Sequence, residues 1–225
     1  MHSTLSPDRW AVVVPLKASA RGKSRIDVDP VLRRRLARAM AVDTATAASA
    51  AAGVGAVLVV VEDPADAEQL DAISGLRVHL TRTRELNGAI ADGLAALPGG
   101  FTGPVAVLPG DLPSLTADEL AGALAAARPH LLAVVADRQG TGTTLLTAAS
   151  RGGLRPQYGA GSLRRHLAAG AVPIELPVDS GLRRDVDSAD DLRGVTGPST
   201  AAVLAETCCG SGAGWPGLCA ARPAG

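Results

Sequence analysis

The sequence is poor in aromatic residues, and its cysteines are confined to one end. Aromatic side chains make up 2% of the 225 residues, so a hydrophobic core has to be built from Ala, Val and Leu. All three cysteines, Cys208, Cys209 and Cys219, lie in the last eighteen residues. This distribution excludes a disulfide-built secreted domain and, in the body of the chain, a cysteine nucleophile or a zinc–thiolate site.

The sequence also lacks an excess of charge and a long apolar segment. Its 22 basic and 22 acidic residues cancel, so no overall field favours nucleic acid or an anionic membrane. The longest apolar run, residues 56–61, is too short to span a bilayer. The first residues, with Asp8 and Arg9 before an apolar run, do not resemble a signal peptide. The sequence therefore predicts a cytoplasmic protein with neither a nucleic acid nor a membrane as partner.

Short apolar runs alternate with helical stretches along the chain. Because the runs are apolar throughout, they are typical of strands buried on both faces; they cover residues 10–16, 56–61, 105–108, 131–136 and 172–178. Helices are expected at residues 30–52, 86–97, 116–128 and 162–169, the third with Thr116 as N-cap and Glu119 in a capping box. This alternation predicts a single α/β domain with a mainly parallel, mixed sheet flanked by helices.

The composition changes near the end of the chain. From about Thr207 the sequence reads "CCGSGAGWPGLCAARPAG", which has no helical or strand periodicity. We therefore expect a folded domain at residues 1–206 and a disordered tail at residues 207–225.

Three aspartates are candidates for a metal site. In "RRDVDSADDL", Asp185 and Asp187 lie two residues apart and would share one face of an extended chain. They could bind a cation, pair with Arg183 and Arg184, or lie in water. Asp111, in the turn "LPGDLPSL" after an expected strand, could join them around one Mg²⁺, which prefers carboxylate oxygens and leaves room for substrate phosphates.

Other polar stretches favour the binding of small anions. The loop "PLKASARGKSRI" carries four cations, Lys17, Arg21, Lys23 and Arg25, directly after the first expected strand, although it lacks the P-loop spacing. "DRQGTGTTLL" could be an anion-binding turn or a plain hairpin, and "YGAGSL" an anion site or a plain helix cap. The four histidines form no ligand motif, and His166 is expected at the surface.

In their order along residues 10–195, these stretches, with "VVVEDP" and "ELNGAI", resemble the CofC-type guanylyltransferases of coenzyme F-420 biosynthesis. The resemblance implies a Rossmann-like nucleotidyltransferase domain that binds GTP and Mg²⁺. It implies catalytic lysines at Lys17 and Lys23, and nucleotide contacts from Arg25 and Asn87. The metal ligands would be Asp111, Asp185 and Asp187, and the phosphorylated acceptor would contact Thr144, Gly159 and Ser162.

The implied reaction transfers GMP from GTP to phosphoenolpyruvate. The sequence leaves open other acceptors, namely 2-phospho-L-lactate, 3-phosphoglycerate or molybdopterin, and also a non-catalytic GTP-binding module. It leaves open whether the protein forms a homodimer. The acceptor's phosphate is already largely dianionic at neutral pH, since its second pKa is about 6, so the reaction needs no general base. The absence of an evident catalytic histidine is therefore compatible with the implied chemistry.

Overall fold

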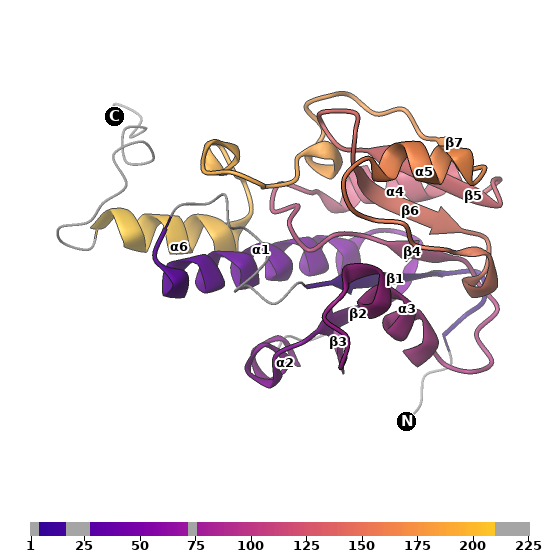
Figure 1. Cartoon of the computed structure of the whole chain (residues 1–225), viewed down its shortest axis with the longest axis horizontal. Helices are drawn as coiled ribbons and strands as arrows, with labels where there is room; N and C mark the ends of the chain where they lie inside the picture. The colour runs from indigo at the N-terminus through magenta and orange to yellow at the C-terminus, as the bar shows by residue number, and fades with distance from the viewer. Residues whose placement is uncertain (1–4, 17–27, 72–75, 210–225) are drawn as a thin grey trace.

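The computed structural model describes residues 5–16, 28–71 and 76–209 of the chain (Figure 1). One seven-stranded sheet has the strand order β3-β2-β1-β4-β6-β5-β7. The strands are β1 (Trp10–Pro15), β2 (Val54–Val61), β3 (Leu76–Leu80), β4 (Val105–Val107), β5 (Leu132–Ala136), β6 (Thr143–Ala148) and β7 (Val172–Pro173). All neighbours pair in parallel except β6, which is antiparallel to both β4 and β5. The predicted mainly parallel, mixed sheet is confirmed.

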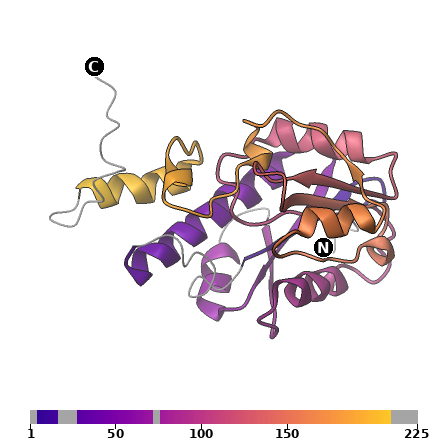
Figure 2. The same ribbon diagram turned by 45° about the horizontal axis from the view of Figure 1, so that its top comes forward.

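Helices cover both faces of this sheet (Figures 1 and 2). They are α1 (Pro30–Ala50), α2 (Pro64–Asp71), α3 (Leu86–Ala96), α4 (Ala117–Ala127), α5 (Ser162–Ala168) and α6 (Pro198–Cys209). Three 3₁₀ helices, Arg151–Gly153, Gly181–Arg183 and Asp190–Leu192, lie in the connections. No helix in the described part of the chain is long and apolar enough to cross a membrane.

Strand β1, in the middle of the sheet, contributes side chains to the hydrophobic core on both faces of the sheet. Successive side chains of a strand point to opposite faces. Val12 and Val14 therefore share a core cluster with Ala45 of α1 and Leu120 of α4, whereas Val13 packs in a second cluster with Ile90 of α3. All of these side chains are essentially inaccessible to solvent. The core is therefore built from aliphatic residues, as the scarcity of aromatic residues requires.

Local sequence signals account for where the long helices begin. The Asp29 carboxylate accepts hydrogen bonds from the backbone N–H groups of Val31 and Leu32, with Pro30 in the first helical position. Thr116 caps α4, and its capping box with Glu119 is present as predicted. Each cap satisfies backbone donors that the helix itself leaves unpaired.

Several expectations about single elements need correction. The strand expected at residues 172–178 is only Val172–Pro173, both exposed, because prolines at 173 and 177 cannot donate to a ladder. Strands β3 and β6 and helices α2 and α6 were not predicted; β6 is the second strand of a hairpin whose turn is the Gly-rich stretch at residues 137–142. The expected domain end at residue 206 falls inside α6, which continues to Cys209.

Candidate active site

The candidate metal residues lie on two segments that the fold holds side by side. Asp111 follows β4 at its carboxyl end, where ligands of open α/β sheets bind. Its position is fixed from α1, because the Thr44 hydroxyl accepts a hydrogen bond from the backbone N–H of Leu112 (3.1 Å). The backbone N–H of Val186 donates to the Asp111 carbonyl oxygen (3.0 Å). The stretch that contains Asp185 and Asp187 is thereby tied to the turn that contains Asp111.

Glu119 holds the start of the segment that leads to Asp185 and Asp187. Besides completing the cap of α4, its carboxylate accepts hydrogen bonds from the Ser180 hydroxyl (2.8 Å) and the Gly181 N–H (2.7 Å). Burial alone would raise the pKa of Glu119, but the hydrogen bonds from Thr116, Ser180 and Gly181 outweigh it and lower the pKa. Gly181 leaves no room for a side chain, since a Cβ atom there would lie 2.1 Å from the Ser114 carbonyl oxygen.

Arg183 also holds the segment that contains Asp185 and Asp187. Its guanidinium donates to the carbonyl oxygens of Leu176 (2.9 Å) and Asp137 (3.0 Å), which belong to the stretch after β7 and to the turn after β5. Arg183 therefore does not pair with Asp185 or Asp187, one of the alternatives that the sequence left open. Instead it brings these aspartates close to the turn at residues 137–142.

Asp185 lies in an electrostatically unfavourable place. Burial, followed by the charges of Asp111, Asp187 and Asp137, raises the pKa of Asp185 to about 7. Its Oδ1 atom is buried and has no hydrogen-bond partner within the described ranges. Buried carboxylate oxygens are normally hydrogen-bonded or bound to a cation, so this atom suits a metal ligand.

The three predicted metal aspartates do not form a closed cluster. Among the residues that the structure describes, no group of three or more His, Cys, Asp or Glu side chains is close enough to hold a metal ion. Asp185 is half-buried and Asp187 is exposed. Mg²⁺ commonly takes only one or two carboxylates and completes its octahedron with water and substrate phosphates. Asp111 and Asp185 fit that pattern, and the full ligand set remains a prediction.

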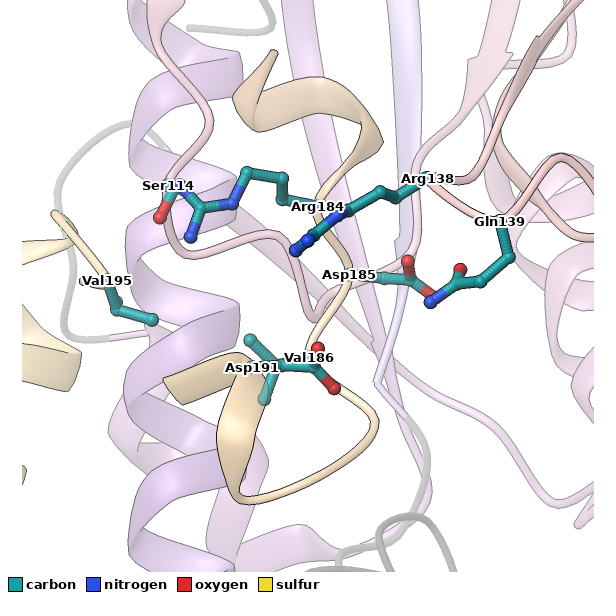
Figure 3. A pocket seen from close by; sticks show the side chains of 8 residues that line it. All are labelled: Ser114, Arg138, Gln139, Arg184, Asp185, Val186, Asp191 and Val195. Atoms are coloured by element: carbon teal, nitrogen blue, oxygen red, sulfur yellow. The ribbon is translucent and has the colours of Figure 1, made fainter. Parts of the chain in front are cut away.

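Two arginines, of which the sequence analysis named only Arg184, line a hollow together with Asp185. A small hollow is lined by Ser114, Arg138, Gln139, Arg184, Asp185, Val186, Asp191 and Val195. Figure 3 shows the guanidinium groups of Arg138 and Arg184 directed into it. Neither makes a hydrogen bond or ion pair with a residue in the described ranges, whereas the carboxylate of Asp191 accepts from the N–H and hydroxyl of Ser188. The hollow thus combines two arginines with two carboxylates, those of the proposed metal aspartate Asp185 and of Asp191. Burial alone would raise the pKa of Asp191, but its hydrogen bonds from Ser188 and Asp187 and the charge of Arg138 outweigh it and lower the pKa.

The predicted acceptor residues lie beside the hairpin turn. Thr144 is the extra residue of a β-bulge, because Val135 pairs with Leu145 while Ala136 pairs with Thr143. Its buried hydroxyl donates to the Ala136 carbonyl oxygen (3.4 Å). Gly159 has φ +121°, a backbone conformation that glycine adopts readily and that is strained for other residues.

Ser162 is placed differently from the expectation. The N-cap of α5 is Gly161, with φ +70°, so Ser162 is the first helical residue and does not cap the helix. Its hydroxyl donates to Thr143 Oγ1 (3.2 Å) and its N–H to the Gly159 carbonyl oxygen (3.0 Å). The structure therefore joins Ser162 to Thr143 and Gly159, and a ligand would have to replace one of these hydrogen bonds.

Two further residues have roles that sequence reasoning missed. His166 was expected at the surface, but it is 1% exposed, with Nδ1 2.9 Å from Thr143 Oγ1 and Nε2 accepting from the Gln157 N–H (3.0 Å). Burial, and then the charge of Arg165, lowers its pKa to about 4. The i, i+4 spacing from the buried Ser162 was the available signal, since it places both side chains on one helix face. Asn87 bonds to the backbone of Tyr158, and its expected contact with the nucleotide stays a prediction.

Three predicted residues, Lys17, Lys23 and Arg25, lie outside the described residues. They belong to the connection between β1 and α1, which begins at the carboxyl end of β1. Their assignment to GTP and catalysis therefore stays a prediction.

Comparison with known proteins gives consistent relatives. Residues 10–195 match the family described as "Guanylyl transferase CofC like". The phosphoenolpyruvate guanylyltransferase of Streptomyces scabiei (strain 87.22) is 42% identical over 212 residues, which cover 88% of this chain and 96% of the relative. The enzyme with the same name from Streptomyces coelicolor (strain ATCC BAA-471 / A3(2) / M145) is 43% identical over 204 residues, with the same two coverages.

Solved structures agree with this fold. A putative nucleotide-diphospho-sugar transferase from Desulfovibrio desulfuricans G20 matches with a TM-score of 0.66 at 17% identity, covering 90% of this chain and 96% of that one. A CMP:2-keto-3-deoxy-manno-octonic acid synthetase complexed with CTP matches with a TM-score of 0.55 at 16% identity, covering 88% and 99%. The family match spans most of the chain, and the chain therefore belongs to the CofC-like guanylyl transferase family, a family of nucleotidyltransferase enzymes.

Proposed function

We propose that this enzyme transfers GMP from GTP to the phosphate of phosphoenolpyruvate, forming enolpyruvoyl-2-diphospho-5′-guanosine and diphosphate in coenzyme F-420 biosynthesis. The observation that carries the proposal is the identity of about two residues in five with phosphoenolpyruvate guanylyltransferases over most of both chains. The buried Oδ1 atom of Asp185, which has no hydrogen-bond partner within the described ranges, and the two arginines Arg138 and Arg184 beside it support a site for phosphates and a cation.

The chemical step is an in-line displacement at the α-phosphorus of GTP. A phosphate oxygen of the acceptor forms the new P–O bond, the bond from the α-phosphorus to the bridging oxygen breaks, and diphosphate leaves with that electron pair. Because the nucleophile is already ionised, the protein supplies alignment and charge neutralisation instead of a base. The geometry of His166 agrees with this scheme, since both ring nitrogens face other protein groups.

The aspartates would hold Mg²⁺. Asp111 and Asp185, joined through the Val186 N–H, would be its ligands, with Asp187 at the exposed side. Mg²⁺ held there would supply positive charge to offset the negative charge that develops on the leaving diphosphate. Arg138 and Arg184 would neutralise a further phosphate or carboxylate charge next to it. Lys17, Lys23 and Arg25 would serve the triphosphate, as the family resemblance implies.

The acceptor would lie against β6 and the start of α5. Thr144 on the bulge, Gly159 with its left-handed backbone and Ser162 beside Thr143 would form its binding surface. A carboxylate or phosphate approaching Gly159 meets no Cβ atom, so the backbone can come close to the ligand.

One assay tests the proposal and its alternatives. Diphosphate release from GTP and Mg²⁺ is measured with phosphoenolpyruvate, 2-phospho-L-lactate, 3-phosphoglycerate and molybdopterin in turn, and the guanylylated product is identified by mass spectrometry. We expect the highest kcat/KM with phosphoenolpyruvate. A higher value with another acceptor would change the substrate, and GTP binding without turnover of any acceptor would favour the non-catalytic module.

A further inference from the structure

The segment at residues 157–161, here called the Tyr158 loop, leads from the sheet into α5 and contains Gly159. Its main-chain polar groups are bonded by side chains from outside the loop. The Asn87 carboxamide on α3 makes two hydrogen bonds to one residue: its Oδ1 accepts from the Tyr158 N–H (2.8 Å), and its Nδ2 donates to the Tyr158 carbonyl oxygen (3.2 Å). Because the Tyr158 N–H and C=O belong to the peptide units before and after this residue, the two bonds fix the main chain on both sides of the Tyr158 Cα atom.

His166 on α5 holds the preceding residue. Its Nε2 accepts from the Gln157 N–H, so the proton of the neutral ring sits on Nδ1 and is donated to Thr143 Oγ1. The Ser162 hydroxyl donates to the same Thr143 oxygen (3.2 Å). One buried imidazole therefore connects the Tyr158 loop to Ser162 through a single threonine.

Arg165 holds the loop carbonyls. Its Nε and Nη2 donate to the Gln157 carbonyl oxygen (3.1 and 2.9 Å), and its Nη1 donates to the Ala160 carbonyl oxygen (2.7 Å). The Tyr158 hydroxyl donates inward to the Val107 carbonyl oxygen (3.3 Å), which anchors the loop to the sheet. Gly159 is thus flanked on both sides by residues whose backbone is bonded to the scaffold.

We propose that Asn87 and His166 are positioning residues for the acceptor: they hold Gly159 and Ser162 in the conformation that receives the phosphorylated three-carbon acid. The inference rests on the proposed function for the identity of that acid, and on the hydrogen bonds of Asn87 and His166 to residues 157 and 158 for the way the Tyr158 loop is held. It replaces the expectation that Asn87 binds the nucleotide, since the Asn87 oxygen and one of its two amide N–H groups are already used by Tyr158.

The first test separates acceptor from nucleotide. In Asn87→Ala both bonds to Tyr158 are lost, and we expect the KM for phosphoenolpyruvate to rise roughly 10-fold or more while the KM for GTP changes less than about twofold. In Asn87→Asp the acceptor for the Tyr158 N–H remains but a carboxylate faces the Tyr158 carbonyl oxygen, so an intermediate rise is expected. Glu85→Ala is the matched control, because Glu85 precedes the same helix, is exposed and makes no side-chain cap bond.

The second test uses rescue at His166. His166→Leu removes the acceptor for the Gln157 N–H, whereas His166→Gln restores an oxygen acceptor at a similar reach. We expect the Leu variant to raise the KM for phosphoenolpyruvate and the Gln variant to recover most of the wild-type value. Recovery by Gln would not occur if His166 only filled space or acted as an acid or base in the reaction.

Amide hydrogen exchange measures how firmly the Tyr158 loop is held, independently of catalysis. In Asn87→Ala, amide exchange in the peptide that contains residues 157–161 should accelerate, with no change in peptides from β1 or α1. A raised KM for GTP with an unchanged one for phosphoenolpyruvate would return Asn87 to the nucleotide and overturn the proposal. Faster exchange without any change in the acceptor's KM would also overturn it. Wild-type protein that prefers another acceptor would refute the proposed substrate alone, and the same variants would then be measured with that acceptor.

Discussion

At the scale of single residues, the surroundings of Asp185 are the feature that is least favourable for the stability of the fold. Asp185 places a buried carboxylate oxygen among the charges of Asp111, Asp187 and Asp137, and that oxygen has no hydrogen bond within the described ranges. A buried charge without a partner costs stability unless a cation compensates it. Such a cost is characteristic of functional sites.

Replacing Asp185 with Asn should therefore separate stability from activity. We expect Asp185→Asn to reduce Mg²⁺-dependent turnover about a thousandfold, because transition-state charge is no longer neutralised, and Asp187→Asn to act in the same direction. Without metal, the melting temperature of Asp185→Asn should not fall, since the neutral amide relieves repulsion. Steady-state kinetics over a Mg²⁺ titration and thermal unfolding check both parts. Near-normal rates at saturating Mg²⁺ would make both aspartates structural.

Thr144 offers a matched comparison within one strand. Thr144 and Thr147 are both buried on β6, and each hydroxyl donates to a β5 carbonyl oxygen at 3.4 Å. Thr144→Val and Thr147→Val should destabilise the protein to a similar extent. Only Thr144→Val should weaken acceptor binding, by about 1–3 kcal/mol, because only Thr144 is proposed to contact the acceptor. Equal effects on the acceptor's KM in the two variants would remove Thr144 from the site.

His166 should make stability depend on pH. Its pKa is about 4 in the folded protein, whereas an unfolded chain gives about 6.5. Between these values the unfolded state binds a proton that the folded state does not, so the free energy of unfolding falls as the pH drops from about 6.5 to 4. The loss is at most about 3 kcal/mol.

The variant His166→Gln isolates this contribution. Denaturant unfolding at pH 7.0 and 4.5 should show a smaller loss of stability for the variant than for the wild type, because glutamine does not titrate. Carboxylates titrate in both proteins, so they cancel in the comparison. Equal losses would mean that His166 can be protonated in the folded state without cost.

At the scale of elements, a buried carboxylate of α1 caps helix α6. Asp43 of α1 accepts hydrogen bonds from the N–H groups of Ser199 and Thr200 (2.9 and 2.8 Å) and from the Thr200 hydroxyl (2.7 Å). It thus caps α6 across 156 residues of sequence. Gly197 allows this approach, because a Cβ atom there would lie 2.3 Å from the Asp43 carboxylate. Figure 1 shows α6 lying alongside the beginning of α1.

Removing this cap should release α6 while leaving the site in place. Asp43→Ala leaves buried donors unpaired, and we expect a loss of about 2–3 kcal/mol in the free energy of unfolding. Thr200→Val removes a single bond and should cost about 1 kcal/mol. Urea denaturation measures both, and kcat at 25 °C should change little. A larger effect of Thr200→Val than of Asp43→Ala would contradict Asp43 as the organising residue.

At the scale of the whole molecule, the site is assembled from segments far apart in sequence. The turn after β4, the turn after β5 and the stretch after the 3₁₀ helix at Gly181–Arg183 meet through the Val186–Asp111 and Arg183–Asp137 backbone contacts. Antiparallel β6 brings Thr143 and Thr144 back beside β5, and α5 follows next to them. Each contact is between main chain and a distant element, so the site exists only in the folded chain.

The residues after α6 provide a further prediction at this scale. Deleting residues 210–225 should change neither the melting temperature nor kcat/KM, because a segment rich in Gly, Pro and Ser can bury little apolar surface. The cut leaves α6, with its Arg35–Glu206 ion pair, complete. A clear loss of stability or activity would assign Cys219 or its neighbours a role in the folded enzyme.

The sequence by itself determined the α/β class, the positions of strands β1, β2, β4 and β5 and of helices α1, α3, α4 and α5, and the segments that carry the family's motifs. These features are local: the apolar runs of β1 and β2, the Thr116–Glu119 box and the Asp–x–Asp spacing can be recognised without knowing what they touch. The exposed β7 was mispredicted because apolar composition does not reveal that a strand lies at an edge and is interrupted by prolines.

Only the tertiary structure decided which polar groups are engaged and with what. The family resemblance implies a nucleotide contact for Asn87 and says nothing of the two backbone partners that the packing of α3 against the Tyr158 loop gives it. His166 was expected at the surface because it follows Arg164 and Arg165, but the turn of α5 buries it against Thr143. Hydrogen bonds between residues 9 to 157 positions apart depend on how elements pack, and no local periodicity encodes that.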